Sequence, residues 1–204
     1  MKIQAYPLGE LQANCYFLAI DKDCLIIDAG DSADFILEKV QRENFKVRAV
    51  IATHGHFDHL MAAGEVQVSL DIPFYLGEED LFLLKRVQET AQHFLGARPA
   101  ILQPKEVTNL KEGDIEIGPF SFEVVATPGH TPGSRCLYFK DEQTIFTGDT
   151  LFKEGIGRYD FSYSDKRLLK DSLERLFKLP EETLVYSGHG DVTTLGEEEK
   201  RRII

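Results

Sequence analysis

The chain has 204 residues, of which 43% are hydrophobic, and a formal net charge of −11. This length and apolar content suit the core of one α/β domain, and since no linker, repeat or low-complexity tract divides the chain, we expect a single domain over residues 1–204. The negative charge disfavours nucleic-acid partners, which require a basic face. Residues 1–7 lack the apolar stretch of a signal peptide and no apolar run could cross a bilayer, so we expect a cytoplasmic protein without membrane association.

The first half of the chain alternates patterns typical of strands and helices. Apolar stretches predict strands at about 13–20, 24–28 and 47–53. Helical spacing of apolar residues predicts helices at about 32–44, between residues 59 and 72, and at about 78–95. Ser32 or Asp31 can cap the first of these helices through a side-chain oxygen. His93 lies on the third, where we expect an ordinary helix residue.

The second half of the chain predicts two hairpins, then a helix and a strand. Residues 115–124 alternate apolar and polar side chains on both sides of Gly118-Pro119, and a second hairpin joins residues 136–139 to 144–146. A helix is expected at about 164–178, a strand at 183–186 and a short charged helix at the chain end. Helices and strands mixed in this way favour an α/β fold with two facing sheets between outer helices, a four-layer αββα sandwich.

The segment 53–59 contains three histidines and an aspartate directly after an apolar stretch. A buried strand that ends in imidazoles and a carboxylate delivers them at its C-terminal end, where binding sites usually lie. His54 and His56 can point the same way from an extended backbone, whereas Asp58 and His59 fall in the following turn or first helical residues. A single histidine is usually an ordinary core or surface residue, but this cluster predicts a metal site divided between two adjacent ions.

Three more candidate ligands follow apolar strands in turns that contain glycine. His130 lies in Thr-Pro-Gly-His-Thr-Pro-Gly at residues 127–133, and His189 lies in Ser-Gly-His-Gly at residues 187–190. Asp149 comes directly after Thr-Gly at the end of another apolar stretch. Four strand ends therefore carry the same chemistry, and we expect them to converge on one edge of the sandwich.

The His-x-His-x-Asp-His motif at residues 54–59, followed by separate histidine, aspartate and histidine motifs, resembles the metallo-β-lactamase-fold superfamily. The resemblance extends from Asn14-Cys15-Tyr16 through Ile26-Ile27-Asp28-Ala29-Gly30 to His189 and implies a single metallo-hydrolase domain with the αββα fold. Residues 127–134 and 155–161 are similar to the glyoxalase II-like, or hydroxyacylglutathione hydrolase-like, branch and to the persulfide-dioxygenase-like branch.

The resemblance divides the ligands between two metal ions, with Asp149 as the bridge. It assigns His54, His56 and His130 to one ion and Asp58, His59 and His189 to the other. Imidazole and carboxylate ligands without cysteine suit two divalent ions per chain, zinc first, with iron or manganese as alternatives. Asp58 and Asp149 are the expected catalytic carboxylates.

Two residues outside the ligand set each have two open interpretations. Asp28 can accept a proton from a ligand imidazole and fix its tautomer, or it can be a turn-forming carboxylate before Gly30. Arg158 can bind a substrate carboxylate through its two-pronged guanidinium, or it can form an ion pair with Asp160.

The resemblance implies a dinuclear hydrolase that cleaves a small-molecule thioester of the hydroxyacylglutathione type. Two cations lower the pKa of a shared water from about 15.7 towards about 7, so hydroxide is available at neutral pH. Glyoxalase II enzymes carry a C-terminal helical domain that helps to hold glutathione, whereas 15 residues follow His189 here. We therefore expect that domain to be absent, which leaves the thiol part of the substrate open.

Persulfide dioxygenation is the alternative function that the same motifs allow. In that branch one iron, held by His54 or His56 together with His130 and Asp149, would oxidise a glutathione persulfide. One iron per chain would therefore support oxidation, and two ions would support hydrolysis. β-Lactam hydrolysis is not expected, because a bridging Asp149 without an export signal is untypical of drug-degrading enzymes.

Overall fold

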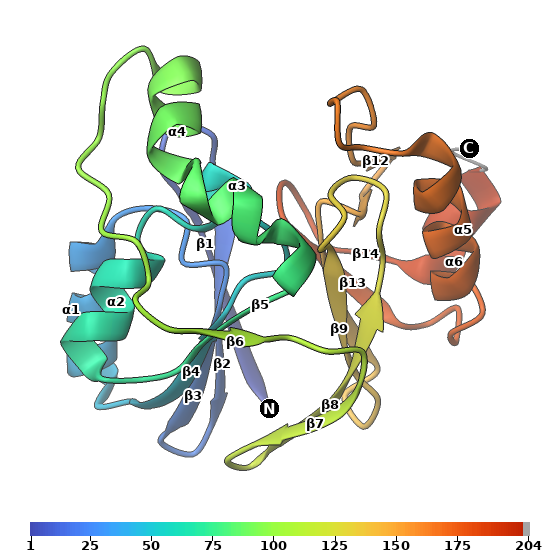
Figure 1. Cartoon of the computed structure of the whole chain (residues 1–204). Coiled ribbons are helices and arrows are strands. Elements are labelled where there is room, and N and C mark those ends of the chain that lie inside the picture. The colour runs from blue at the N-terminus through green and yellow to red at the C-terminus, as the bar shows by residue number, and fades with distance from the viewer. Residues whose placement is uncertain (202–204) are drawn as a thin grey trace.

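Over residues 1–201, the range that the computed structural model describes, two six-stranded sheets face each other and helices cover their outer sides. In Figure 1, helices α1 (Ala33–Glu43) and α2 (Ala63–Leu70) lie against the first sheet. Helices α5 (Lys166–Leu176) and α6 (Leu195–Arg201) lie against the second. The four-layer αββα sandwich expected from the sequence is therefore confirmed.

The first sheet contains, in spatial order, β1 (Lys2–Leu8), β2 (Ala13–Ile20), β3 (Asp23–Ile27), β4 (Lys46–Ile51), β5 (Phe74–Leu76) and β6 (Val107–Asn109). The pairs from β1 to β3 are antiparallel, and the pairs from β3 to β6 are parallel. Parallel neighbours end at the same edge of a sheet. The C-terminal end of β4, after which the histidine cluster follows, therefore lies at that edge.

The second sheet contains, in spatial order, β14 (Thr193–Thr194), β13 (Leu184–Ser187), β10 (Thr144–Gly148), β9 (Arg135–Phe139), β8 (Phe120–Ala126) and β7 (Gly113–Ile117). Strand β9 is antiparallel to β8 and β10, and β13 is parallel to β10. Strands β8, β10 and β13 therefore run in one direction and end at one edge. A separate ribbon of β11 (Leu151–Phe152) and β12 (Gly155–Ile156) follows β10.

Three buried apolar clusters hold the four layers together. In β3, Ile26 packs in the cluster on the helix side of the first sheet, whereas Leu25 packs between the sheets. In β10, Phe146 packs between the sheets, whereas Ile145 packs with Leu173 of α5. Successive side chains of a strand point to opposite faces, so strands covered on both faces need a continuous apolar sequence. This is why the strands that precede the candidate ligands appear as apolar runs.

The single helix expected at about 78–95 is wrong, because the segment is broken into three parts. A 3-10 turn over Glu78–Asp80 leads into α3 (Leu81–Lys85), and α4 (Val87–Leu95) begins after Arg86. Arg86 has φ −103° and ψ 6°, outside the helical region. Buried side chains lie on both sides of this break, so the apolar periodicity continues through it and does not reveal it.

The other predicted elements are present, with small shifts of their ends. Ser32 lies at the N-cap of α1 with φ 53°, but its side chain makes no capping hydrogen bond. The sequence patterns do not predict β1, β5, β6, β11, β12 or β14; β5 and β6 have three residues each and β11, β12 and β14 have two each, too few to show a period of two. The charged helix at the chain end is α6.

Residues 202–204 lie outside the described range, and the single domain over 1–204 stays a prediction. No helix within residues 1–201 is long and apolar enough to cross a membrane.

The packing of α5 gives a test of the layer arrangement. Leu173 is 2% exposed in the cluster between α5 and the second sheet, so Leu173→Ala is expected to lower the free energy of unfolding by about 2–5 kcal/mol. Lys170→Ala, on the exposed side of the same helix, is expected to change it by less than about 0.5 kcal/mol. Urea unfolding followed by circular dichroism measures both, and equal losses would contradict the assigned buried face.

Candidate metal centre

All seven predicted ligands lie together at the edge where the strands end. His54 and His56 follow β4, Asp58 and His59 lie in a 3-10 turn over Phe57–His59, His130 lies between β8 and β9, Asp149 follows β10 directly, and His189 follows β13. They form two groups, and within each group the potential ligand atoms lie within 4.8 Å of one another. The convergence expected from the sequence is present, and metal binding by these residues stays a prediction.

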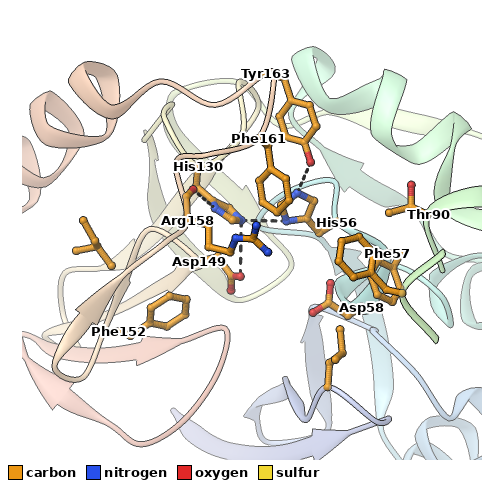
Figure 2. Close-up of a pocket in the computed structure, with 13 residues that line it drawn as sticks. His56, Phe57, Asp58, Thr90, His130, Asp149, Phe152, Arg158, Phe161 and Tyr163 are labelled. Atoms are coloured by element: carbon orange, nitrogen blue, oxygen red, sulfur yellow. Dashed lines mark hydrogen bonds and ion pairs between the residues drawn. The ribbon is translucent and has the colours of Figure 1, made fainter. Parts of the chain in front are cut away.

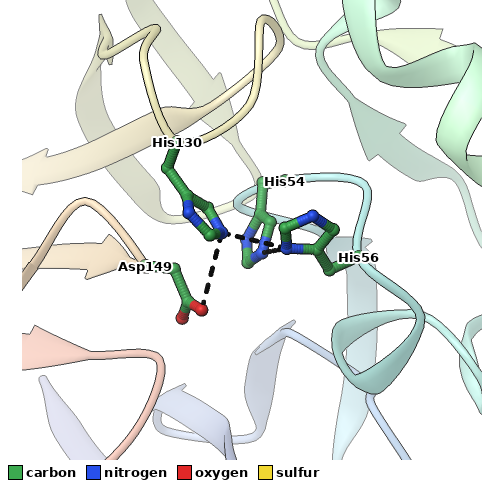
Figure 3. Close-up of side chains that lie close together, drawn as sticks. All are labelled: His54, His56, His130 and Asp149. Atoms are coloured by element: carbon green, nitrogen blue, oxygen red, sulfur yellow. Dashed lines mark hydrogen bonds and ion pairs between the residues drawn. The ribbon is translucent and has the colours of Figure 1, made fainter. Parts of the chain in front are cut away.

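The first group consists of three imidazoles and one carboxylate whose polar atoms point toward a common centre (Figure 3). His56 Nδ1 lies 3.0 Å from His54 Nε2 and 2.9 Å from His130 Nε2. Asp149 Oδ2 lies 3.6 Å from His130 Nε2. Three nitrogens and one oxygen in this arrangement have the composition of a tetrahedral transition-metal site.

The second group lies beside the first and shares Asp149 with it. Asp58 Oδ2 lies 3.7 Å from His59 Nε2 and 3.3 Å from His189 Nε2. The other carboxylate oxygen of Asp149, Oδ1, lies 3.4 Å from His59 Nε2 and 3.8 Å from His189 Nε2. The two oxygens of Asp149 therefore face different groups, which is the position that a bridging carboxylate requires.

Two buried polar atoms of the centre have no partner among the described residues. They are His59 Nε2 and Asp149 Oδ1, and neither makes a hydrogen bond. An unpaired buried polar atom costs free energy comparable to a lost hydrogen bond, and most such atoms in native proteins are paired. A cation between these two atoms would satisfy both. Nitrogen and oxygen donors without sulfur suit zinc, iron or manganese, so the residues present fit two divalent ions.

Asp28 connects two of the ligand imidazoles on the side away from the centre. Its carboxylate accepts hydrogen bonds from Thr53 N at 2.7 Å, from Thr53 Oγ1 at 2.8 Å and from His59 Nδ1 at 3.0 Å. Because the Thr53 hydroxyl donates to Asp28, its oxygen accepts from His54 Nδ1, 3.1 Å away. The Nε2 atoms of both histidines are thereby left free to bind a cation. Asp28 also has φ 55°, which is typical of a turn residue, and its role in orienting a metal ligand stays a prediction.

The remaining imidazoles are oriented in the same way. His130 Nδ1 donates to the backbone carbonyl of Arg158 at 2.8 Å, and His189 Nδ1 donates to that of Leu11 at 3.1 Å. A carbonyl can only accept, so Nδ1 carries a proton in each ring and Nε2, which faces the centre, is the nitrogen that can bind a cation. His56 Nε2 lies 2.8 Å from the hydroxyl of Tyr163, a contact that the sequence analysis does not predict.

Strand β2 fixes the loop that carries His189. The side-chain amide of Asn14 donates to the carbonyl oxygens of Ser187 at 3.1 Å and Gly190 at 3.0 Å. The hydroxyl of Tyr16 donates to the Ser187 carbonyl at 2.5 Å. These bonds run between the two sheets, so the start of the family resemblance at Asn14 corresponds to a support for the last ligand.

Burial favours neutral imidazoles at His54 and His56 in the first group, whereas nearby carboxylates favour a proton or a cation at His59 in the second group. Burial lowers the pKa of His54 well below its ordinary value, and burial lowers the pKa of His56 to about 3. Burial also lowers the pKa of His59, but Asp58 and the other nearby carboxylates outweigh this and hold it well above its ordinary value. Burial raises the pKa of Asp149, but His59 and the other imidazoles hold it well below its ordinary value. A cation bound beside His59 would replace its proton.

Asp80 is a buried carboxylate at the centre that sequence reasoning misses. It accepts hydrogen bonds from Gly55 N at 2.7 Å, Thr131 Oγ1 at 2.6 Å and Gly133 N at 2.6 Å. Burial raises the pKa of Asp80, and the three donors oppose this. Asp80 thus connects the loop of His54 and His56 to the loop of His130. In the sequence it is one acid among three at the start of a helix, and nothing local distinguishes it.

A pocket of about 300 Å³ opens over the centre, with Asp58, Asp149 and His130 in its floor (Figure 2). Its apolar lining consists of Leu11, Phe57, Phe94, Phe152, Ile156 and Phe161. Arg158 also lines the pocket, and its guanidinium donates to Asp160 through Nε at 2.9 Å and Nη2 at 2.8 Å. The ion pair expected as one interpretation of Arg158 is therefore present, and substrate binding by Arg158 stays a prediction. His93 does not line this pocket and is an exposed residue of α4, as expected.

A family model described as Metallo-beta-lactamase superfamily matches residues 8–189 of the chain. The chain belongs to this superfamily. Among its curated relatives, the probable metallo-hydrolase YqgX of Bacillus subtilis is 39% identical over 194 residues, which cover 95% of this chain and 92% of the relative. Hydroxyacylglutathione hydrolase GloC of Haemophilus influenzae is 33% identical over 204 residues, which cover 98% of this chain and 96% of the relative.

Solved structures of metallo-beta-lactamase superfamily proteins superpose over nearly the whole chain. The B3 metallo-beta-lactamase BLEG-1 gives a TM-score of 0.91 at 36% identity and covers 98% of this chain and 97% of its own. A di-iron-bound form of TTHA1623 gives 0.89 at 37% identity and covers 97% of each chain. ETHE1 from Myxococcus xanthus gives 0.78 at 30% identity and covers 98% of this chain and 82% of its own. The relatives differ in the activity for which they are named, so membership gives metal-dependent hydrolase chemistry without the substrate.

The shared position of Asp149 gives a test of the metal centre. Asp149→Ala is expected to lower the metal content from two ions per chain to one or none, because both groups lose an oxygen ligand. Elemental analysis of protein purified without added metal measures the content. Asp160→Ala, which removes an exposed carboxylate, is the control and should retain both ions. Two ions in Asp149→Ala would exclude the bridge.

The contacts of Asp80 predict a loss of metal affinity without loss of a ligand. In Asp80→Asn an amide NH2 would face donors where a carboxylate oxygen accepts hydrogen bonds, so the two ligand loops would separate. We expect metal affinity to fall by roughly 10–100-fold, the usual effect of removing a residue that orients ligands. Competition with a chelator measures the affinity. Asp141→Asn, an exposed acid in the turn before β10, should bind metal like the wild type.

Proposed function

We propose that the protein is a dinuclear metal-dependent hydrolase of small-molecule thioesters, and that thioesters of the hydroxyacylglutathione type are the class to test first. The observation that carries this proposal is the position of Asp149, whose two oxygens face two complete groups of candidate ligands. One group would suffice for a single redox-active iron. The second group, with Asp58, His59 and His189, has a clear use when two ions act together on one water.

Two bound ions would supply a water whose pKa is lowered to about 7 and a Lewis acid for the carbonyl oxygen. The residues of the chain position these groups. Asp149, with an oxygen on each side, would orient the attacking water between the two groups, and Asp58 would hold the second ion at the pocket floor. A thiolate leaving group has a pKa near 8.5 and needs little protonation, which suits a pocket without a dedicated acid.

The relatives support a hydrolase without fixing the acyl compound. The 33% identity to a protein named hydroxyacylglutathione hydrolase favours a thioester. The likeness to a B3 metallo-beta-lactamase weakens the sequence-based argument against β-lactams, so a β-lactam belongs in the substrate panel. Zinc is the first candidate metal, and the di-iron form of TTHA1623 makes iron the second.

Persulfide dioxygenation is the second candidate function, because the motifs that resemble the hydrolase branch also resemble the dioxygenase branch. The two reactions require different metal contents. One iron per chain, with oxygen uptake on addition of glutathione persulfide, would support the dioxygenase. Two ions per chain, with thiol release from a thioester and no oxygen uptake, would support the hydrolase.

The proposed mechanism predicts a pH profile and its loss in a ligand variant. kcat/KM for a thioester should rise with pH and level off near pH ~7, as the attacking water becomes ionised. His59→Ala should lower kcat/KM by at least about 100-fold, because it removes a ligand of the second ion while the first group keeps its own. Thiol release measured with a thiol-reactive dye gives both quantities.

His93→Ala is the matched control for the loss of a histidine. His93 is exposed on α4 and lies outside the pocket lining, so this variant should keep wild-type kinetics and metal content. Normal turnover in His59→Ala together with two bound ions would exclude the two-metal mechanism.

A further inference from the structure

The pocket over the metal centre has an apolar wall. Phe57, Phe152 and Phe161 lie on different sides of the ligand side chains in Figure 2. Phe94 is 50% exposed and stacks on Phe57 with a ring separation of 5.6 Å, and Leu11 is 44% exposed. Exposed apolar surface that is gathered around a cavity favours a ligand that buries it. A substrate with an apolar group would gain this burial, and a purely polar substrate would not.

Apart from the two proposed metal ions, the described side chains that line the pocket offer little positive charge to a substrate carboxylate. Among the described residues, Arg158 is the one lysine or arginine in its lining, and its guanidinium donates through Nε and Nη2 to Asp160, whose carboxylate neutralises its charge. The guanidinium carbon also lies 4.4 Å from the centre of the Phe161 ring, which holds the side chain flat against the wall.

A substrate carboxylate must compete with Asp160 for Arg158. Asp160 is two residues away in the chain, so its effective concentration at Arg158 exceeds that of a substrate in solution. The pair is exposed, with 59% of the Arg158 side chain and 63% of the Asp160 side chain accessible. A substrate carboxylate can therefore reach Arg158 and replace Asp160. Which carboxylate binds Arg158 depends on the substrate concentration, and Asp160, the intramolecular partner, is favoured.

We infer that this pocket selects thioesters whose acyl and thiol parts are apolar and uncharged, and that Asp160 enforces the selection by pairing with Arg158 and neutralising its charge. This inference rests on the proposed thioester hydrolysis and specifies its substrate class. Asp160 is then a specificity-determining residue, because it contacts Arg158 and takes no part in the reaction at the metal centre. Glutathione, which carries two carboxylates, is then a poor thiol for this pocket.

Four thioesters test the selection. Acetyl and phenylacetyl groups are each joined to N-acetylcysteamine, which is uncharged, and to 3-mercaptopropionate, which carries one carboxylate. The metal-loaded wild type should cleave the phenylacetyl N-acetylcysteamine thioester best. kcat/KM should fall about 10-fold when the thiol carries the carboxylate, the effect of one unpaired charged group. It should also fall at least about 10-fold when acetyl replaces phenylacetyl, because less apolar surface is buried.

Variants separate the two parts of the inference. Asp160→Asn releases Arg158, so the preference for the uncharged thiol should shrink about 10-fold. The double variant Arg158→Ala with Asp160→Asn should restore the preference. Glu38→Gln, which removes one exposed acid from α1, is the control for net charge and should leave the preference unchanged. Phe94→Ala, at the pocket mouth away from the candidate ligands, should raise KM for the phenylacetyl thioesters and not for the acetyl thioesters.

Binding of unreactive analogues distinguishes failure of the inference from failure of the proposed function. Thioethers that carry a phenylethyl group on the same two thiols have no thioester bond to cleave, and calorimetry gives their Kd. Tighter binding of the uncharged thioether supports the selection even if no thioester is cleaved, in which case the proposed function is wrong. Equal binding, or preference for the carboxylate-bearing compounds in wild-type protein, would overturn the selection whether or not hydrolysis occurs. A preference that Asp160→Asn leaves unchanged would overturn the role of Asp160.

Discussion

The carboxylate of Asp149 is the group on which the rest of the centre depends, because its two oxygens face two different sets of imidazoles. A short side chain can do this only if it lies between both sets, directly after a strand that ends at the same edge as the strands that precede the imidazoles. The common direction of β8, β10 and β13 provides that position. Close approach is also needed, and a Cβ atom at Gly188 would overlap Asp149 Oδ1. Glycine after β13 is therefore required by the geometry of the bridge.

Two buried carboxylates outside the ligand set make the centre rigid. Asp28 and Asp80 each accept three hydrogen bonds, and each contacts the loop that carries His54 and His56. Burying an acid costs free energy unless donors surround it, so each of these acids persists only while its loops stay in place. The dependence is mutual, because the loops are held by the acids. Asp28 orients imidazoles directly, and Asp80 fixes the separation between two ligand loops.

The sequence predicts the features of this molecule that depend on local patterns. Strand ends that carry His54, Asp149 or His189 are recognisable because an apolar run and a polar residue are adjacent in the chain. Asp80 is not recognisable, because its partners lie 25, 51 and 53 residues away and no local pattern records them. The break at Arg86 is hidden for the opposite reason: both arms bury apolar side chains, so the pattern is continuous. The contact of Arg158 could be predicted in part, because its partner Asp160 is two residues away and an ion pair between them was one of the two interpretations from the sequence.

The centre and the pocket wall come from different parts of the fold, and this separates chemistry from selectivity. The candidate ligands follow sheet strands and are largely buried, so their positions depend on the packing of both sheets. Phe57 of the wall lies in the turn that carries Asp58 and His59, but much of the wall comes from α4 and from residues 152–161, where Phe94, Arg158 and Asp160 are exposed. Substitutions at exposed positions usually cost little stability. A superfamily can therefore keep one centre and change its substrates through the wall, which agrees with relatives that share this fold under different names. For this chain, we propose that the apolar wall and the ion pair of Arg158 with Asp160 decide the choice of substrate.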